Sequence, residues 1–140
     1  MKKILLLAFI FGLIGFHCKK EDPATGQTSL LKTKWILSSI SDTRTNAITK
    51  YPDNIHQEYI IFSDSINVLM VGGVCNGCRG NYIINSDLIS TNGLACTMIY
   101  CSQWEDYLFS NLDSMYQYKI NNNQLTIYSN GKYNLHFIAE

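Results

Sequence analysis

Short apolar segments separated by polar turns run through most of the chain beyond residue 30, and many of the segments are apolar at every second residue. This period of two is typical of β-strands with one buried face. Ser, Asp, Asn and Gly, which favour tight turns, lie between neighbouring segments. We therefore predict strands at Lys34–Ile40, Tyr59–Phe62, Ile66–Val71 and Tyr82–Ile84, with a further strand that begins at Leu88.

The C-terminal part of the chain has the clearest alternation. Residues 116–120, 124–129 and 133–139 each alternate with period two, and polar turns at residues 121–123 and at Asn130–Gly131 separate them. Asn-Gly between two alternating segments is the strongest short-range signal of a β-hairpin. These residues predict a meander of three antiparallel strands.

A helix is predicted near residues 103–113. Ser102 precedes Glu105 by three residues, which is the spacing of a capping box at a helix N-terminus. Apolar residues then recur at helical spacing, which predicts a face packed against the core. This stripe consists of Trp104, Leu108, Leu112 and Met115, and Phe109 widens it.

Together these elements predict a mainly β domain of the α+β class. We expect a curled antiparallel sheet or small barrel of about seven or eight strands with one packed helix. Residues 41–57 are polar and contain Pro52, so they are expected to form a long loop. Asn92–Gly93 is expected to bulge or kink its strand.

Residues 1–17 have the pattern of a signal peptide. Two lysines precede an apolar run, Ile4–Phe16, that is shorter than the roughly 20 residues needed to span a bilayer. After this run come His17 and then Cys18, which resembles the lipobox of bacterial lipoproteins, where this cysteine becomes the lipidated first residue. Residues 18–29 then form an expected flexible linker, and its CKKED start is similar to the surface-export signal of Bacteroidetes lipoproteins. We expect an outer-membrane lipoprotein exposed at the cell surface, with the membrane as its partner through the anchor.

Residues 30–140 are enough for one domain with a single core, and we expect a monomer. Over the whole chain 11 Lys and Arg balance 11 Asp and Glu. No positive field therefore favours nucleic acid as a partner.

Four cysteines follow the predicted signal peptide and anchor: Cys75, Cys78, Cys96 and Cys101. Their spacing is close to that of a zinc ribbon. An exported protein, however, passes through an oxidising compartment where cysteines pair. A redox CxxC motif would need a helix N-terminus, whereas the sequence around Cys75 predicts a turn. We favour two structural disulfides and keep zinc or redox-active thiols as alternatives.

A hairpin turn near residue 86 would place Cys78 opposite Cys96, with Cys75 and Cys101 as an outer nested pair. Pairing within each close couple is an open alternative. The neighbouring glycines are expected to allow positive φ angles and close backbone approach around the bridges. They are Gly72, Gly73, Gly77 and Gly80.

The sequence around the four cysteines resembles the META domain, also called the HslJ-like domain. Cys75-Asn76, Gly80 and Tyr82 match its CNxxxGxY motif, and Thr97 with Cys101 matches its later T-x-x-x-C element. The similarity extends from about residue 35 to residue 138. It implies a compact β-rich domain with one helix, a Cys75–Cys101 bridge and an added Cys78–Cys96 pair. It also implies an envelope-associated role linked to stress or drug tolerance, and no particular reaction.

Candidate catalytic residues are few. His56 lies in a polar segment, and His136 alternates with apolar neighbours, so it is expected to point outward from a strand. Neither accompanies a nucleophile motif. Three carboxylates, Asp53, Glu58 and Asp64, are scattered in loop or turn surroundings. We predict no catalytic, cofactor-binding or metal-binding residues.

The predicted role is therefore that of a non-enzymatic structural or binding module, and the sequence leaves open whether its partner is a protein or a small apolar ligand. The alternative hypothesis is specifically a ligand-binding module, with the apolar ligand held inside the curled sheet as in lipocalin-type barrels. A hydrolase with an unrecognised site is the third hypothesis.

Overall fold

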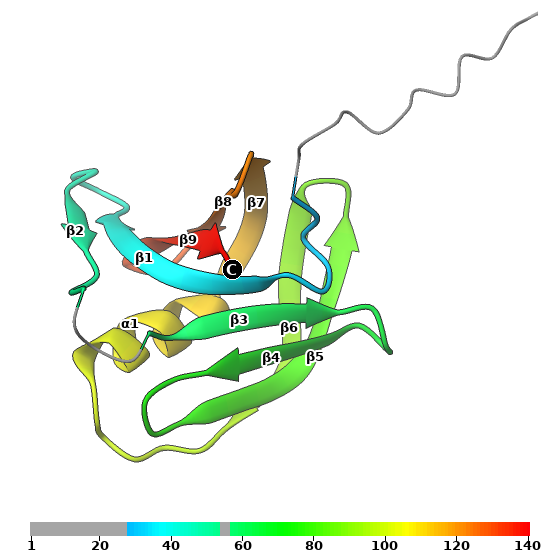
Figure 1. Cartoon of the computed structure of the whole chain (residues 1–140), viewed down its shortest axis with the longest axis horizontal. Coiled ribbons are helices and arrows are strands. Elements are labelled where there is room, and N and C mark those ends of the chain that lie inside the picture. Colours follow the sequence, from blue (N-terminus) through cyan, green and yellow to red (C-terminus); the bar gives the residue numbers. More distant parts are fainter. Residues whose placement is uncertain (1–27, 54–56) are drawn as a thin grey trace, which may run out of the picture.

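An antiparallel barrel of eight strands forms the body of the domain (Figure 1). The computed structural model describes residues 28–53 and 57–140, and every structural statement below concerns these residues. The expected mainly β fold with one packed helix is confirmed. In chain order the elements are β1 (Lys34–Asp42), β2 (Ile48–Lys50), β3 (Tyr59–Ser63), β4 (Val68–Gly72), β5 (Gly77–Asn85), β6 (Leu88–Cys96), α1 (Gln103–Leu112), β7 (Met115–Asn121), β8 (Gln124–Ser129) and β9 (Tyr133–Ala139).

The barrel closes between the first and last strands. β1 pairs with β9 from Trp35 and Ala139 at one end to Asp42 and Tyr133 at the other. The opposite edge of β1 is shared, because β3 pairs with its N-terminal half and the extra strand β2 pairs with its C-terminal half. In Figure 1, β9 therefore lies beside β1 although it comes from the other end of the chain.

Large apolar side chains fill the barrel interior. Trp35, Phe62 and Phe137 are almost completely excluded from solvent, and they belong to one continuous core. Each such side chain stabilises the fold by roughly 1.5–3 kcal/mol through its removal from water. The core residues among those described extend from Leu30 to Phe137, so nearly the whole described segment contributes to one core.

The helix begins where the sequence predicts. The Ser102 hydroxyl caps α1 by accepting a hydrogen bond from the Trp104 backbone N–H at 3.1 Å. Leu108 and Leu112 pack into the core, as expected from the apolar stripe. The second half of the predicted capping box is wrong, because the Glu105 side chain bonds to a different segment of the chain.

Several element boundaries differ from the prediction. Met115 belongs to β7 and not to the helix, and the expected loop at residues 41–57 contains β2. Ile66 has a left-handed φ of 56° and lies in the turn before β4. β5 is longer than the predicted Tyr82–Ile84 segment because its first residues pair with β4 and β6.

The expected irregularity in β6 is present. The pairing between β5 and β6 shifts register next to Gly80, and Gly93 on β6 has a φ of +69°. Such a bulge bends the strand and raises its twist, which helps a sheet to curl into a barrel. In the described part of the chain, no helix is both long and apolar enough to cross a membrane.

Candidate functional site

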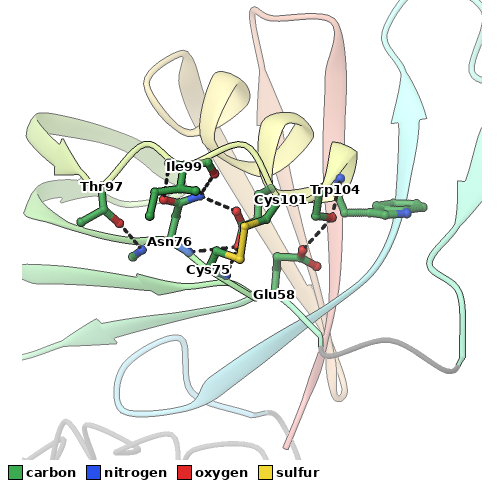
Figure 2. The surroundings of a disulfide bond; sticks show 10 residues. Glu58, Cys75, Asn76, Thr97, Ile99, Cys101 and Trp104 are labelled. Atoms are coloured by element: carbon green, nitrogen blue, oxygen red, sulfur yellow. Dashed lines mark hydrogen bonds between the residues drawn. A yellow bond between two sulfur atoms is a disulfide. The ribbon is translucent and has the colours of Figure 1, made fainter.

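Two connections meet at one end of the barrel and are joined by a disulfide bond, and a second disulfide links the strands next to them. Cys75, between β4 and β5, is bonded to Cys101, between β6 and α1. Cys78 and Cys96 are register partners on β5 and β6 and form the second disulfide. The two bonds have the nested arrangement, and Figure 2 shows the outer one. With all four sulfurs in disulfides, none is a thiolate that could bind zinc.

Asn76 and Glu105 form the centre of this region. Glu105 Oε1 accepts hydrogen bonds from the backbone N–H groups of Cys75, at 2.7 Å, and Asn76, at 3.2 Å. Glu105 Oε2 accepts a third bond from Asn76 Nδ2 at 2.6 Å. Asn76 and Glu105 are both buried. Glu105 therefore ties the start of α1 to the turn that precedes β5.

The same asparagine holds the loop after β6. Asn76 Nδ2 also donates to the Ile99 carbonyl at 2.5 Å, and Asn76 Oδ1 accepts from the Ile99 N–H at 2.8 Å (Figure 2). Next to this pair, Thr97 Oγ1 accepts from the Gly77 N–H, and the Thr97 N–H donates to the Gly77 carbonyl. The loop is thus attached to the start of β5 by the hydrogen bonds of Asn76 and Gly77, in addition to the disulfides.

The remaining residues of the CNxxxGxY motif also have packing contacts. A Cβ atom at Gly80 would lie 2.9 Å from the backbone of the β6 bulge, so only glycine fits there without a shift. The Tyr82 ring packs edge-on against Phe62, and its hydroxyl donates to the Ser63 carbonyl at 2.8 Å. The motif therefore specifies how β5 and its neighbours fit together.

The expected positive φ angles at the four glycines near the cysteines are absent. Among the described glycines, Gly93 is the one with a positive φ. Close approach does occur at Gly73, where an added Cβ would overlap the Glu105 carboxylate. The glycine is required there because a buried side chain occupies the space, and not because of its backbone conformation.

A second buried carboxylate, Glu58, lies close to the first. The Ser102 hydroxyl is 3.4 Å from Glu58 Oε1, and Glu58 Oε2 makes no hydrogen bond with the described residues. Tyr51 is buried beside it and packs against Trp104 with its ring tilted by 46° and 4.6 Å between the ring centroids. Three ionisable side chains are therefore buried together at the start of α1: those of Glu58, Tyr51 and Glu105.

The surroundings shift the acidities of these groups in opposite directions. Burial raises the pKa of Glu58, and the nearby charge of Glu105 adds to this, while the Tyr51 and Ser102 hydroxyls oppose it. Burial alone would also raise the pKa of Glu105, but the N–H groups of Cys75 and Asn76 outweigh it, so that pKa is lowered. Burial and Glu58 raise the pKa of the Tyr51 phenol.

Glu58 and Tyr51 are the residues of this cluster that sequence reasoning misses, and Tyr51 is buried within the segment expected to be a polar loop. The sequence places Glu58 among scattered loop carboxylates, whereas the structure buries it completely. Glu58 has the same parity as Ile60 and Phe62, which face the core from β3. Extending the period of two by one step upstream would have predicted an inward side chain.

The other candidates lie apart from this cluster. His136 Nε2 and Nδ1 contact the hydroxyls of Ser41 and Thr126 on neighbouring strands, and burial lowers the His136 pKa. Asp53 is exposed, and Asp64 forms an exposed ion pair with Lys32 at 2.7 Å. The residues of the predicted signal peptide, Cys18 and His56 lie outside the described residues.

The buried carboxylates of the cluster differ sharply in accessibility from the loop beside them. Glu58 and Glu105 are closed off from solvent, so neither carboxylate is accessible to an outside molecule. Within residues 28–53 and 57–140, no group of three His, Cys, Asp or Glu side chains is placed to hold a metal ion. The loop that the cluster supports is instead strongly exposed: Met98 is 90% and Tyr100 is 81% accessible.

Comparisons with known proteins agree with the fold and the motif. An NMR structure of a protein from Burkholderia xenovorans has a similar fold, with a TM-score of 0.64 and 18% identity over 89% of this chain and 97% of that chain. No curated protein matches the chain. The sequence model of the META domain matches residues 28–140. This domain is not a known enzyme family. On this match, the chain belongs to the META domain family.

Proposed function

We propose that the protein is a lipid-anchored, non-enzymatic binding module of the cell envelope, exposed at the cell surface. The observation that carries the proposal is the pair of disulfides, Cys75–Cys101 and Cys78–Cys96. Disulfides form and persist in exported proteins and are rare in the reducing cytosol. They support the export that the signal-like N-terminus predicts.

The use of the polar groups supports a role without catalysis. The buried Glu105 carboxylate is fully engaged in holding the turn before β5, and His136 bridges neighbouring strands. Glu58, whose pKa is raised, has no path to solvent. An enzyme needs a positioned nucleophile, base or metal that its substrate can reach.

The surface supports a binding role. Val74, Met98, Ile99 and Tyr100 are exposed apolar residues next to the outer disulfide. Contiguous exposed apolar side chains on a soluble domain mark interaction surfaces. The hydrogen bonds between Asn76 and Ile99 hold this loop in one conformation, which lowers the entropy cost of binding. Envelope stress or drug tolerance would be the setting for such a module.

The alternative of an apolar ligand inside the barrel has no supporting observation. The barrel interior is already filled by side chains that have almost no surface accessible to solvent, among them Trp35, Leu69 and Phe137. Interiors packed in this way lack voids of ligand size. We therefore place binding on the outer surface.

The anchor is tested by replacing Cys18 with Ser in the native host. We expect the wild type to incorporate labelled fatty acid and to sediment with membranes, and the variant to do neither. Replacing Lys20, Glu21 and Asp22 with Ala is the matched control for the export signal. It should keep the lipid but lose cleavage by protease added to whole cells. An unlipidated wild type would contradict the anchor, and unchanged cleavage of the triple variant would contradict surface export.

A further inference from the structure

A groove runs along the outer face of α1, between the end of β6 and the start of β9. Its volume is about 650 Å³, which is within the range of small-molecule sites. Met98, Tyr107, Phe109 and Tyr133 line it with apolar and aromatic surface. The α1 residues that line it are exposed or half-buried, whereas Glu105 of the Asn76–Glu105 cluster is buried and is not part of the lining.

The aromatic wall of the groove is held in place from behind. Tyr107 and Tyr133 pack with 4.8 Å between ring centroids, and Tyr107 also packs edge-on against Trp104 at 5.7 Å. The Tyr133 backbone N–H donates to Oδ1 of the buried Asn111 at 3.0 Å. The rings therefore form a preorganised surface, and little entropy would be lost when a ligand binds.

The charges at the groove are mainly negative. Asp106 of α1 and Asp113, the C-cap residue of this helix, line it, and their spacing of seven residues places them on the same side. Neither forms an ion pair with a described residue. Lys132 is the single basic residue in the lining, so the groove carries two negative charges and one positive charge.

Lys132 shows which chemical group the aromatic wall accepts. Its Nζ atom lies over the Tyr133 ring, 4.9 Å from the ring centroid. The negative face of an aromatic ring attracts ammonium groups in this way, by about 0.5–1 kcal/mol at exposed sites. An ammonium group of the protein itself thus occupies a position that a ligand ammonium group could take.

From this geometry we infer that the groove binds an amphiphilic cation, a molecule with an ammonium group on an apolar body. The apolar body packs on Phe109 and Met98, while the ammonium group lies near Tyr133 and the two aspartates and displaces Lys132. The inference deepens the proposed binding role by naming a ligand class, and it does not depend on the lipid anchor.

The test uses residues 24–140, which contain every core residue of the described part of the chain, with their disulfides intact. Decyltrimethylammonium is titrated into the protein by calorimetry below its critical micelle concentration, and decyl sulfate and decyl maltoside serve as anionic and neutral comparators. We expect saturable binding of the cation and at least about tenfold weaker binding of the other two, since charge complementarity is lost. Amide NMR shifts should locate the bound cation at residues 106–113 and 132–133.

Paired variants separate the groove from nonspecific detergent binding. Replacing Asp106 and Asp113 together with Asn should weaken binding of the cation by roughly three- to tenfold. Lys132→Met should tighten it, because a competing cation is removed from the Tyr133 ring. The matched control is Asp87→Asn, in the β5–β6 turn, where Asp87 accepts from Gln117 at 2.6 Å. It should leave the affinity unchanged, and circular dichroism should show that every variant is folded.

The inference is overturned if the cation does not bind saturably, if all three probes bind alike, or if the variants at the groove behave like the Asp87 control. A preference for decyl maltoside would indicate a purely apolar surface and would also overturn it. Any of these outcomes leaves the fatty-acid labelling at Cys18 unaffected. Conversely, an unlipidated Cys18 would contradict the anchor and would not change the binding measured on residues 24–140.

Discussion

The side chains of Asn76 and Glu105 meet in a buried hydrogen bond of 2.6 Å, although 29 positions separate them in the chain. Asn76 belongs to the turn before β5, and Glu105 belongs to the first turn of α1. Through this pair, the family motif, the exposed loop and the helix form a single unit. Asn76 also forms hydrogen bonds with the backbone of Ile99, so a substitution of Asn76 or Glu105 should alter the conformation of the exposed loop.

Replacing Glu105 with Ala should destabilise the domain by about 3 kcal/mol or more. The N–H groups of Cys75 and Asn76 would lose their acceptor in a largely buried position, and each unsatisfied donor costs roughly 1–3 kcal/mol. Urea unfolding of the oxidised protein measures the change. Asp106→Ala, one residue further along the helix on its exposed side, is the control and should stay within about 0.5 kcal/mol. An equal decrease in the free energy of unfolding in the two variants would show that the hydrogen bonds of Glu105 do not stabilise the domain.

Glu58 should make the domain less stable as the pH rises above the ordinary glutamate value of 4.5. Its pKa is raised in the folded state, so between 4.5 and that raised pKa the folded protein binds more protons than the unfolded chain. Glu58→Gln removes this titration. The free energy of unfolding of the variant, relative to the wild type, should therefore increase with pH in that interval.

Urea unfolding at a series of pH values from 4 to 8 checks this prediction. Asp64→Asn is the control, because Asp64 is exposed and its ion pair with Lys32 lowers its pKa. Its effect on stability should be constant above pH 5. A difference between Glu58→Gln and the wild type that does not change with pH would contradict the prediction. Glu105 works in the opposite direction, since its lowered pKa contributes stability that is lost as the pH falls through the folded-state value.

Gly73→Ala should destabilise the domain by roughly 1–3 kcal/mol, because its new methyl group would overlap the Glu105 carboxylate. Gly77→Ala is the matched control. Its added Cβ would lie 3.4 Å from the nearest atom, the Val71 carbonyl oxygen, which is an ordinary contact. Thermal unfolding of both variants tests the difference. If the two glycine variants melt together, the close approach at Gly73 is not a constraint.

Full reduction should increase the mass of residues 24–140 by about 4 Da, because each disulfide gains two hydrogen atoms. Replacing both Cys75 and Cys101 with Ala should cost about 2–4 kcal/mol and speed hydrogen exchange at the Ile99 amide. Removing Cys78 and Cys96 instead should cost a similar amount but leave the Ile99 amide protected. No gain in mass on reduction would revive the zinc hypothesis.

Sequence reasoning located most elements of this fold because their signals are local. The alternation in residues 116–139 and the Asn130–Gly131 turn predict the β7–β8–β9 meander, and Ser102 predicts the start of α1. Local signals were weakest where no periodic pattern exists. The three residues of β2 are all exposed, so burial left no alternation by which to recognise the strand.

The roles of the buried carboxylates were not predictable in this way. By sequence, Glu105 fits a capping box. Only the position of the turn at Cys75 in the folded domain shows which N–H groups its carboxylate accepts from. Glu58 looks like a solvated loop residue until β3 is placed against α1. The groove on α1 likewise requires Lys132 and Tyr133 of a distant segment to be placed beside Asp106.

By itself the sequence determined the mainly β character and the helix start, because side-chain periodicity and capping act between residues close in the chain. For the cysteines it left pairing within each close couple open, and the structure shows the nested order. The tertiary structure alone decided that β1 pairs with β9, that Asn76 meets Glu105, and which face of α1 stays open. Those contacts join residues far apart in the chain. Their formation depends on how the whole sheet twists and closes, which no local pattern encodes.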